Sequence, residues 1–228
     1  MGIPVLIIGK SGTGKSRSMK NCVGKDFGLI RVLNKPLPFR GALGGNVSRS
    51  YQEIKAAVKS PQWPKSIIID DAGYLITGQF MERHSSEGKG NAVYALYNQL
   101  ADDFYHLIEC ITDETPNNRI VYVIMHEDTN DFGDIKPKTI GKLLDEKVCL
   151  EGMFTIVLRA VKGEKYVFVT QSRDGAVSKA PDDMFPEIEI DNDLLMVDNT
   201  IREYYGIINK KNVKKTEETE NDNETTGL

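Results

Sequence analysis

The chain has 228 residues, of which 40% are hydrophobic and 27% are charged, a composition typical of a globular protein with one substantial core. No apolar run approaches the ~20 residues that cross a bilayer, so the composition excludes a membrane-spanning protein. The formal net charge of −4 also excludes a global attraction to nucleic acid, so any such affinity must come from a local patch.

The predicted elements alternate between strands and helices over residues 1–208. Apolar runs predict strands at Ile3–Ile8, Leu29–Leu33, Ser66–Ile69 and Arg119–Met125, then a hairpin formed by Phe154–Val161 and Tyr166–Thr170. Helical spacing predicts helices from about Gly14 to Gly24 and at Ser50–Lys59, Asn91–Ile111, Thr139–Glu146 and Leu194–Tyr205, the last with Asp193 as its N-cap. This alternation predicts an α/β fold with a mostly parallel sheet covered on both faces, whose ligands bind at the C-terminal ends of the strands.

The composition changes after Ile208 to Lys, Glu, Asn and Thr, which predicts a disordered tail over residues 209–228. The last thirteen residues carry five acids and no base, so the body of the chain is close to neutral without them. We therefore predict one domain, residues 1–208, followed by an acidic tail.

A phosphate-binding loop follows the first predicted strand. The pattern G-x-x-x-x-G-K-[ST] is formed by Gly9, Lys10, Ser11, Gly12, Thr13, Gly14, Lys15 and Ser16, with Arg17 next in the chain. Its glycines let successive N–H groups point into one concavity, and the helix predicted after it adds its positive end. We expect these nine residues to contact a nucleotide, with Lys15 reaching the β- and γ-phosphates and Ser16 ligating Mg²⁺.

A second nucleotide-binding motif ends the strand at Ser66–Ile69. An apolar strand followed by Asp70 and Asp71 has the form of a Walker B motif. Asp70 is the candidate ligand of Mg²⁺, and Asp71 is the candidate group that orients the attacking water. Glu82 competes with Asp71 for that second role, and aspartates that simply end a strand in a turn are the structural alternative.

The segment Asp70–Gly73 also fits the D-x-x-G motif of GTPases, so the sequence must decide between GTP and ATP as the nucleotide. A guanine site would add an Asn-Lys-x-Asp loop after a later strand. Asn34-Lys35-Pro36-Leu37 lacks the aspartate and lies too early, and Asn209-Lys210 lies in the tail. ATP is therefore the predicted nucleotide.

His126 ends the strand predicted to lie beside the Walker B strand. An imidazole there can hydrogen-bond the γ-phosphate and report its presence to the next loop. A simple turn histidine is the alternative.

Two long segments that follow these strand ends are predicted to be loops. Gln79 to Asn91 contains Arg83 and Lys89, and Glu127 to Lys138 contains Lys136. Long loops in compact domains are functional or disordered, and basic loops rich in glycine and serine can follow a nucleic-acid backbone. Solvated loops without a partner are the alternative.

Lys138 and Lys142 are candidates for a finger that reaches the γ-phosphate of a neighbouring subunit, or they form a charged first helical turn.

Taken together, these motifs resemble the short RecA-like core ATPases of bacteriophages, a group that includes Sak-type single-strand-annealing recombinases. The resemblance covers roughly Ile3 to Tyr205. Beyond the two nucleotide motifs, it is carried by Tyr74-Leu75, Met125-His126-Glu127, Lys138-Thr139-Ile140-Gly141-Lys142, Glu151-Gly152-Met153-Phe154-Thr155, Met184-Phe185 and Asn192-Asp193-Leu194. It implies a RecA-type core, ATP with Mg²⁺, assembly into rings or filaments, and work on single-stranded DNA through the two loops. The chain departs from the family after its second strand, where Val32-Leu33-Asn34-Lys35 lacks the catalytic glutamate.

The prediction is a Mg²⁺-dependent, DNA-stimulated ATPase that acts on single-stranded DNA in phage recombination or replication. Its partners would be further copies of itself and a single-strand-binding protein or another replication partner, with no membrane. The odd, widely spaced cysteines Cys22, Cys110 and Cys149 indicate reduced thiols, so we expect a cytoplasmic protein, in the host cell if it is phage-encoded. The alternatives are a small-molecule kinase, such as a nucleotide kinase, and a nucleotide-gated assembly protein with little turnover.

Overall fold

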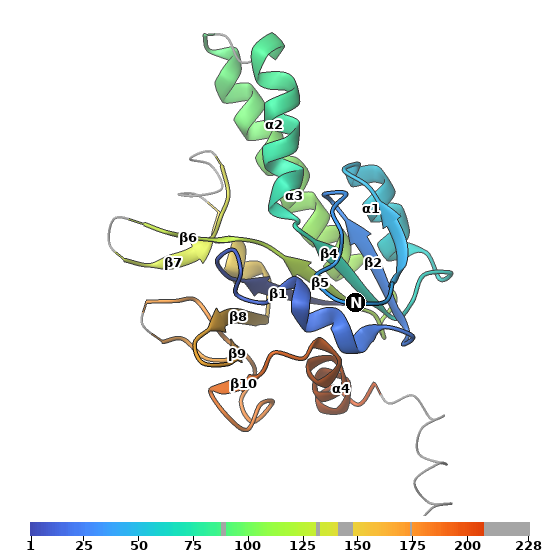
Figure 1. Cartoon of the computed structure of the whole chain (residues 1–228). Helices are drawn as coiled ribbons and strands as arrows, with labels where there is room; N and C mark the ends of the chain where they lie inside the picture. The colour runs from blue at the N-terminus through green and yellow to red at the C-terminus, as the bar shows by residue number, and fades with distance from the viewer. Residues whose placement is uncertain (88–89, 131–132, 141–147, 174, 208–228) are drawn as a thin grey trace, which may run out of the picture.

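The computed structural model describes residues 1–207 except 88–89, 131–132, 141–147 and 174. Its centre is one sheet with the strand order β10-β9-β8-β1-β5-β4-β2-β3 (Figure 1). Neighbouring strands from β8 to β3 in this order run parallel, whereas β9 and β10 are antiparallel additions at one edge. The strands of this sheet are β1 (Ile3–Ile8), β2 (Phe27–Arg31), β3 (Gly44–Val47), β4 (Ser66–Asp70), β5 (Ile120–Ile124), β8 (Ile156–Lys162), β9 (Tyr166–Val169) and β10 (Glu189–Asp191).

Helices cover both faces of this sheet. They are the 3-10 helices η1 (Ser16–Cys22) and η3 (Leu150–Met153) and the α-helices α1 (Tyr51–Lys59), α2 (Gly73–Glu87), α3 (Ala92–Asp113) and α4 (Leu194–Tyr204). Because successive strand residues point to opposite faces, Leu6 and Ile8 pack in a core with α1, α2 and α3, while Val5 and Ile7 pack in a core with η1 and α4. The predicted α/β fold, with a mostly parallel and doubly covered sheet and a late hairpin, is confirmed. No helix in the described part of the chain is both long and apolar enough to cross a bilayer.

The register of the central strands brings three predicted motifs to one edge of the sheet. Strand β5 lies between β1 and β4, with Ile7 opposite Ile124 and Ile69 opposite Val123. The loop after β1, the aspartates that end β4 and His126 after β5 therefore emerge side by side.

Helix α4 is fixed by a buried polar network to the face of the sheet opposite α1, α2 and α3. The Asp198 carboxylate accepts hydrogen bonds from Ser66 Oγ at 2.6 Å and Tyr122 OH at 2.9 Å, and it pairs with Arg202 Nε at 2.7 Å. Each buried group of the network thus has a partner, which is the condition for such a network to stabilise a fold. The Asp193 side chain caps α4 as predicted, by accepting from the N–H groups of Leu195 and Met196.

The segment predicted as a loop from Gln79 to Asn91 is mostly helix, because α2 runs to Glu87. Helices α2 and α3 pack against each other and project together from the sheet (Figure 1). The Phe80 ring stacks on Tyr97 with 5.1 Å between centroids, and Arg83 pairs with Glu87 one turn later at 2.6 Å. The packing of Phe80 on α3 and the ion pair within α2 outweigh the loop-like composition of the segment.

The second predicted loop, Glu127 to Lys138, contains the antiparallel strands β6 (Glu127–Thr129) and β7 (Ile135–Pro137). Its base is held because the buried Glu127 carboxylate accepts from Arg159 at 2.8 and 2.9 Å. The short strands β3 and β10 were not predicted from the sequence either.

Four predicted features fall wholly or partly on positions outside the described residues. Lys89, Lys142 and the tail 209–228 lie outside them, as does most of the helix predicted at Thr139–Glu146. Thr139 and Ile140, the first two residues of that helix, are described and are not helical.

The helix predicted after the phosphate loop is a 3-10 helix over Ser16–Cys22 rather than an α-helix. The Ser18 hydroxyl donates to the Lys15 carbonyl at 2.6 Å, a local bond that competes with the α-helical ladder. The loop's own N–H groups and Lys15, rather than a long helix dipole, must therefore attract phosphate.

Candidate nucleotide-binding site

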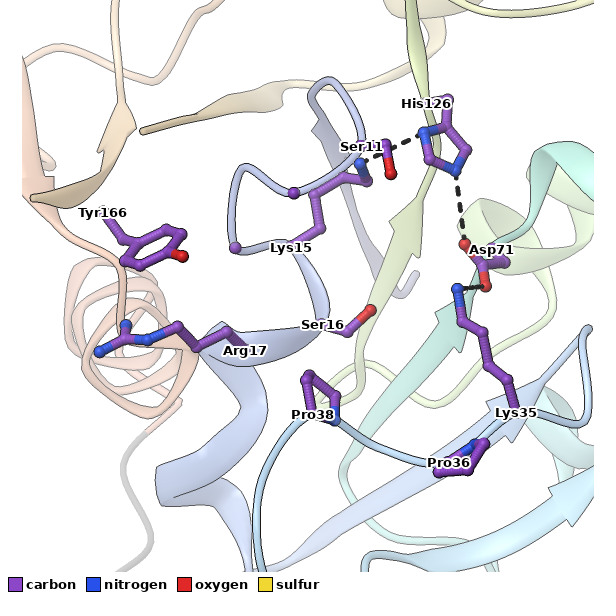
Figure 2. Close-up of a pocket in the computed structure, with 12 residues that line it drawn as sticks. Ser11, Lys15, Ser16, Arg17, Lys35, Pro36, Pro38, Asp71, His126 and Tyr166 are labelled. Carbon is purple, nitrogen blue, oxygen red and sulfur yellow. Dashed lines mark hydrogen bonds and ion pairs between the residues drawn. The ribbon is translucent and has the colours of Figure 1, made fainter. Parts of the chain in front are cut away.

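The phosphate loop lines a pocket of about 380 Å³ at the C-terminal edge of the sheet (Figure 2). Predicted residues in the lining are Ser11, Gly12, Gly14, Lys15, Ser16, Arg17, Asp71 and His126. Gly12 and Gly14 have φ angles of 82° and 94°, in the left-handed region that side chains disfavour, so the curl of the loop depends on them. A volume in this range is typical of pockets for small molecules.

The remaining loop residues, Gly9, Lys10 and Thr13, do not line the pocket but make the hydrogen bonds that hold the loop and Lys15 in place. The buried Lys15 ammonium donates to the carbonyl oxygens of Gly9 at 2.6 Å and Lys10 at 2.8 Å. The Thr13 hydroxyl also donates to the Lys10 carbonyl, at 2.8 Å. The Lys15 side chain is thus folded back over its own loop, next to the concavity where phosphate would sit.

Burial lowers the pKa of Lys15 to about 8, against the opposing pull of Asp71, Asp70 and Glu127. The ammonium is therefore mostly charged at pH 7 and is poorly solvated. A phosphate that enters the pocket would supply the counter-charge that water does not.

Ser16 and Asp70 provide hard oxygen donors beside the phosphate loop, where Ser16 lines the pocket and the buried Asp70 lies next to Ser16 without lining it. The Ser16 hydroxyl lies 3.2 and 3.3 Å from the two Asp70 carboxylate oxygens. Burial and the neighbouring Asp71 raise the pKa of Asp70 to about 6. A hydroxyl beside a buried carboxylate without a cation partner, within the part of the chain that the structure describes, is the oxygen-donor chemistry that Mg²⁺ prefers, so Ser16 and Asp70 fit a magnesium ion. Among the described residues, no group of three or more His, Cys, Asp or Glu side chains forms a closed metal cage, so phosphate and water would complete the coordination.

Asp71 is held in a strained conformation at the centre of the site. Its φ angle is 60°, in the left-handed region that non-glycine residues rarely adopt, and its side chain is only 4% exposed. Strain of this kind is found where a side chain must be aimed at a functional site. One Asp71 oxygen pairs with the Lys35 ammonium, and the other lies 3.7 Å from His126 Nε2.

His126 connects the phosphate loop to Asp71 (Figure 2). Its Nδ1 lies 3.4 Å from the Lys15 ammonium, which can only donate, so Nδ1 is the acceptor and Nε2 carries the proton that faces Asp71. Burial and the Lys15 charge lower the pKa of His126, which favours this neutral ring. The four side chains Lys15, His126, Asp71 and Lys35 form a continuous polar chain across the pocket.

Four lining residues were missed by the sequence reasoning: Lys35, Pro36, Pro38 and Tyr166. Lys35 stands after β2, in the region where the resemblance led us to look for a glutamate. Burial acts to lower its pKa, but the bond to Asp71 and the nearby carboxylates raise it overall. The lysine in Asn34-Lys35 was the available signal, and only the sheet order shows that it reaches Asp71.

Other predicted residues lie away from this pocket. Glu82 is on α2, exposed and paired with Arg49 at 3.4 Å, so the alternative role in orienting water does not fit its position. Arg83 is bound to Glu87 and also to Gln99 Oε1 at 2.7 Å. Lys136 is exposed on β7, and Lys138 pairs with Asp128 at 3.4 Å.

Comparison with known proteins gives a distant likeness in fold. No protein-family model matches the chain. No curated protein matches it either. Among solved structures, the chain is similar to a KaiC-like protein from the hyperthermophilic archaeon Pyrococcus horikoshii OT3, with 12% identity and a TM-score of 0.42 over 78% of this chain and 83% of that one. A likeness of this size says nothing about what this chain binds.

Proposed function

We propose that the chain is a Mg²⁺-dependent, RecA-like ATPase that acts on single-stranded DNA. The observation that carries the ATPase proposal is the convergence of Lys15, Ser16 and Asp70 at one edge of the sheet. The triphosphate binds the N–H groups of the loop, and Lys15 turns from the Gly9 and Lys10 carbonyls to the β- and γ-phosphates. Ser16 and Asp70 would hold Mg²⁺, and an ion bound there would supply neutralisation of the charge that develops during phosphoryl transfer.

Asp71 and His126 serve the hydrolytic step in this proposal. The strained Asp71 carboxylate orients the attacking water. When Lys15 turns to the phosphates, His126 Nδ1 loses its donor, and the ring carries its proton on this nitrogen to donate to the γ-phosphate. Strand β6 begins directly after His126. A shift of the His126 ring when the γ-phosphate binds or leaves therefore moves the β6–β7 hairpin as well.

The DNA-binding part of the proposal is supported by the β6–β7 hairpin and by the family resemblance. Lys136 stands exposed on β7, whereas Arg83 is occupied by its α2 and α3 neighbours. Assembly into a ring or filament would bring Lys138 toward a neighbouring subunit's γ-phosphate once it leaves Asp128. Phage recombination, with a single-strand-binding protein as partner, is the setting that the resemblance suggests.

The proposal is tested by ATP hydrolysis measured with and without single-stranded DNA, run alongside sizing of the protein. We expect Mg²⁺-dependent hydrolysis that DNA stimulates, together with a larger assembly when ATP and DNA are both present. Hydrolysis that DNA leaves unchanged, with no DNA binding in the presence of ATP, would remove the recombination role and leave an ATP-binding protein.

Charge reversal at the hairpin should weaken DNA binding. Each lysine–phosphate contact releases a counterion, so Lys136→Glu is expected to lower affinity for single-stranded DNA and reduce the slope of log affinity against log salt by about 1. Fluorescence anisotropy over a salt series measures both quantities. Lys25→Glu, an exposed lysine before β2 at the opposite edge of the sheet, is the matched control. Equal behaviour of the two variants would move DNA binding away from the hairpin.

The contact between Lys35 and Asp71 favours a second candidate, a nucleotide-gated assembly protein with little turnover. A cation bound to Asp71 competes with the water that the carboxylate would orient, and the nearby glutamate of RecA-type enzymes is missing. In this case ATP binding, rather than hydrolysis, would change the assembly.

Removal of this cation tests whether Lys35 restrains turnover. A partly exposed ion pair contributes up to about 1 kcal/mol, so we expect Lys35→Met to raise basal ATP hydrolysis by roughly fivefold at unchanged assembly. Single-turnover hydrolysis, compared with Lys25→Met, isolates the chemical step. A lower rate would instead assign Lys35 to the γ-phosphate as a second cation.

A further inference from the structure

Asn192 carries a buried amide for which the described residues provide no partner. The residue is 4% exposed, and both its Oδ1 and its Nδ2 lack a hydrogen bond. An unsatisfied buried polar group destabilises a fold, so native structures rarely keep one without a use.

The fold holds this amide in place. Asn192 lies between β10, which pairs with β9, and the start of α4. The next side chain, Asp193, is already engaged by the α4 N–H groups and by Asn21 Nδ2 at 2.6 Å. Because α4 is anchored by the Asp198 network, the amide cannot easily move away to find a partner.

The amide lies directly beside the phosphate loop. A Cβ atom added to Gly14 would stand 3.0 Å from Asn192 Oδ1 and 2.6 Å from Tyr166 Cδ1, so all three groups meet at one point. A second pocket of about 490 Å³, lined by Asn192, Lys20, Asp191 and others, adjoins the phosphate pocket and shares Arg17 and Tyr166 with it. Figure 2 shows Arg17 and Tyr166 together on one side of the loop, away from Asp71.

We propose that this second pocket receives the base of the bound nucleotide and that Asn192 selects adenine. The inference rests on the proposed nucleotide binding and adds the residues that choose the base. With phosphates in the loop, the ribose passes Arg17 and the base reaches Tyr166 and Asn192. An amide places an acceptor beside a donor, which matches N6 and N7 of adenine, whereas the same edge of guanine offers two acceptors.

Tyr166 supplies the stacking surface. Its ring lies 4.7 Å from the Arg17 guanidinium and 5.2 Å from the Lys162 ammonium, and it is only partly buried. In the free protein the Asn192 amide is covered. The base gains access to the amide when the Tyr166 ring turns away from Gly14, and the ring then stacks on the base. Stacking of this kind tolerates every base, so discrimination falls to Asn192.

The test compares three ligands, each with Mg²⁺: ATP, GTP and inorganic tripolyphosphate, which has no base. We expect wild type to prefer ATP over GTP by about tenfold, and Asn192→Leu to remove this preference by weakening ATP alone. Tyr166→Ala should weaken both nucleotides and leave tripolyphosphate binding unchanged. Asn46→Leu, an exposed change at the opposite edge of the sheet, is the control.

Thermal unfolding separates a ligand role from a structural one. Since the amide has no partner in the free protein, Asn192→Leu should keep or raise the melting temperature while it loses the ATP preference. Equal affinity of wild type for ATP and GTP, or an equal loss of all three ligands in Asn192→Leu, would overturn the proposal while leaving the phosphate site intact. Failure of wild type to bind any of the three ligands would overturn the nucleotide site and the base pocket together.

Discussion

Alanine at Lys15 is expected to weaken ATP binding by at least about a hundredfold, because two charge-assisted bonds to the β- and γ-phosphates are lost. Titration calorimetry with Mg²⁺-ATP measures the loss directly. The fold should survive the change. Without the ammonium, the Gly9 carbonyl keeps the N–H of Glu127 at 3.2 Å, and the Lys10 carbonyl keeps the Thr13 hydroxyl.

The melting temperature of Lys15→Ala should therefore stay near that of wild type, since the substitution also removes a buried cation. Lys25→Ala, an exposed change of the same type, controls for the loss of a positive charge. Unchanged ATP affinity in a folded Lys15→Ala protein would refute the phosphate-loop interpretation and, with it, the proposed ATPase.

The parts of the site that the sequence predicted are those encoded by short local patterns. The phosphate loop, Asp70–Asp71 and His126 each follow a strand whose apolar run is unmistakable, and parallel strands place their C-terminal ends at one edge. No structure was needed to bring these three together. Their convergence follows from the alternation of strands and helices.

Lys35 and Tyr166 were missed because their positions depend on the order of strands rather than on any local pattern. Lys35 reaches Asp71 because β2 pairs with β4, and Tyr166 reaches Gly14 from the start of β9, which pairs with β8, the neighbour of β1. Neither pairing leaves a mark near the residue itself. The lack of hydrogen-bond partners for the Asn192 amide is likewise visible only in the packed fold.

Helix α2 shows a different limit. Its sequence is rich in Ser, Gly and charged residues and lacks a strong apolar stripe, so periodicity favours a loop. The helix is stabilised by long-range packing on α3, such as the stack of Phe80 on Tyr97. The DNA-binding role of Arg83 stays a prediction, now for a residue on a helix whose guanidinium is bound to Glu87 and Gln99.

Asparagine at Asp70 is expected to reduce Mg²⁺-dependent ATP hydrolysis by at least about a hundredfold, because the metal contributes several kcal/mol of charge stabilisation in phosphoryl transfer. Asparagine keeps the shape of the side chain and an oxygen that can accept from Ser16, but it loses the negative charge that holds the ion. Binding of ATP without Mg²⁺ should persist, since Lys15 and the loop are unchanged.

The melting temperature of Asp70→Asn shows whether a loss of hydrolysis comes from lost metal binding or from an unstable fold. Burial and Asp71 raise the pKa of Asp70 to about 6 in the folded chain, so the charged carboxylate destabilises the metal-free protein as pH rises through that value. At pH 8, Asp70→Asn should therefore melt no lower than wild type in the absence of metal, and Mg²⁺ with ATP should raise the melting temperature of wild type more than that of the variant. Asp102→Asn on the exposed side of α3 is expected to match wild type in every measurement. Full hydrolysis by a stable Asp70→Asn protein would show that another group holds the metal, and the Ser16–Asp70 pair would then be a structural hydrogen bond.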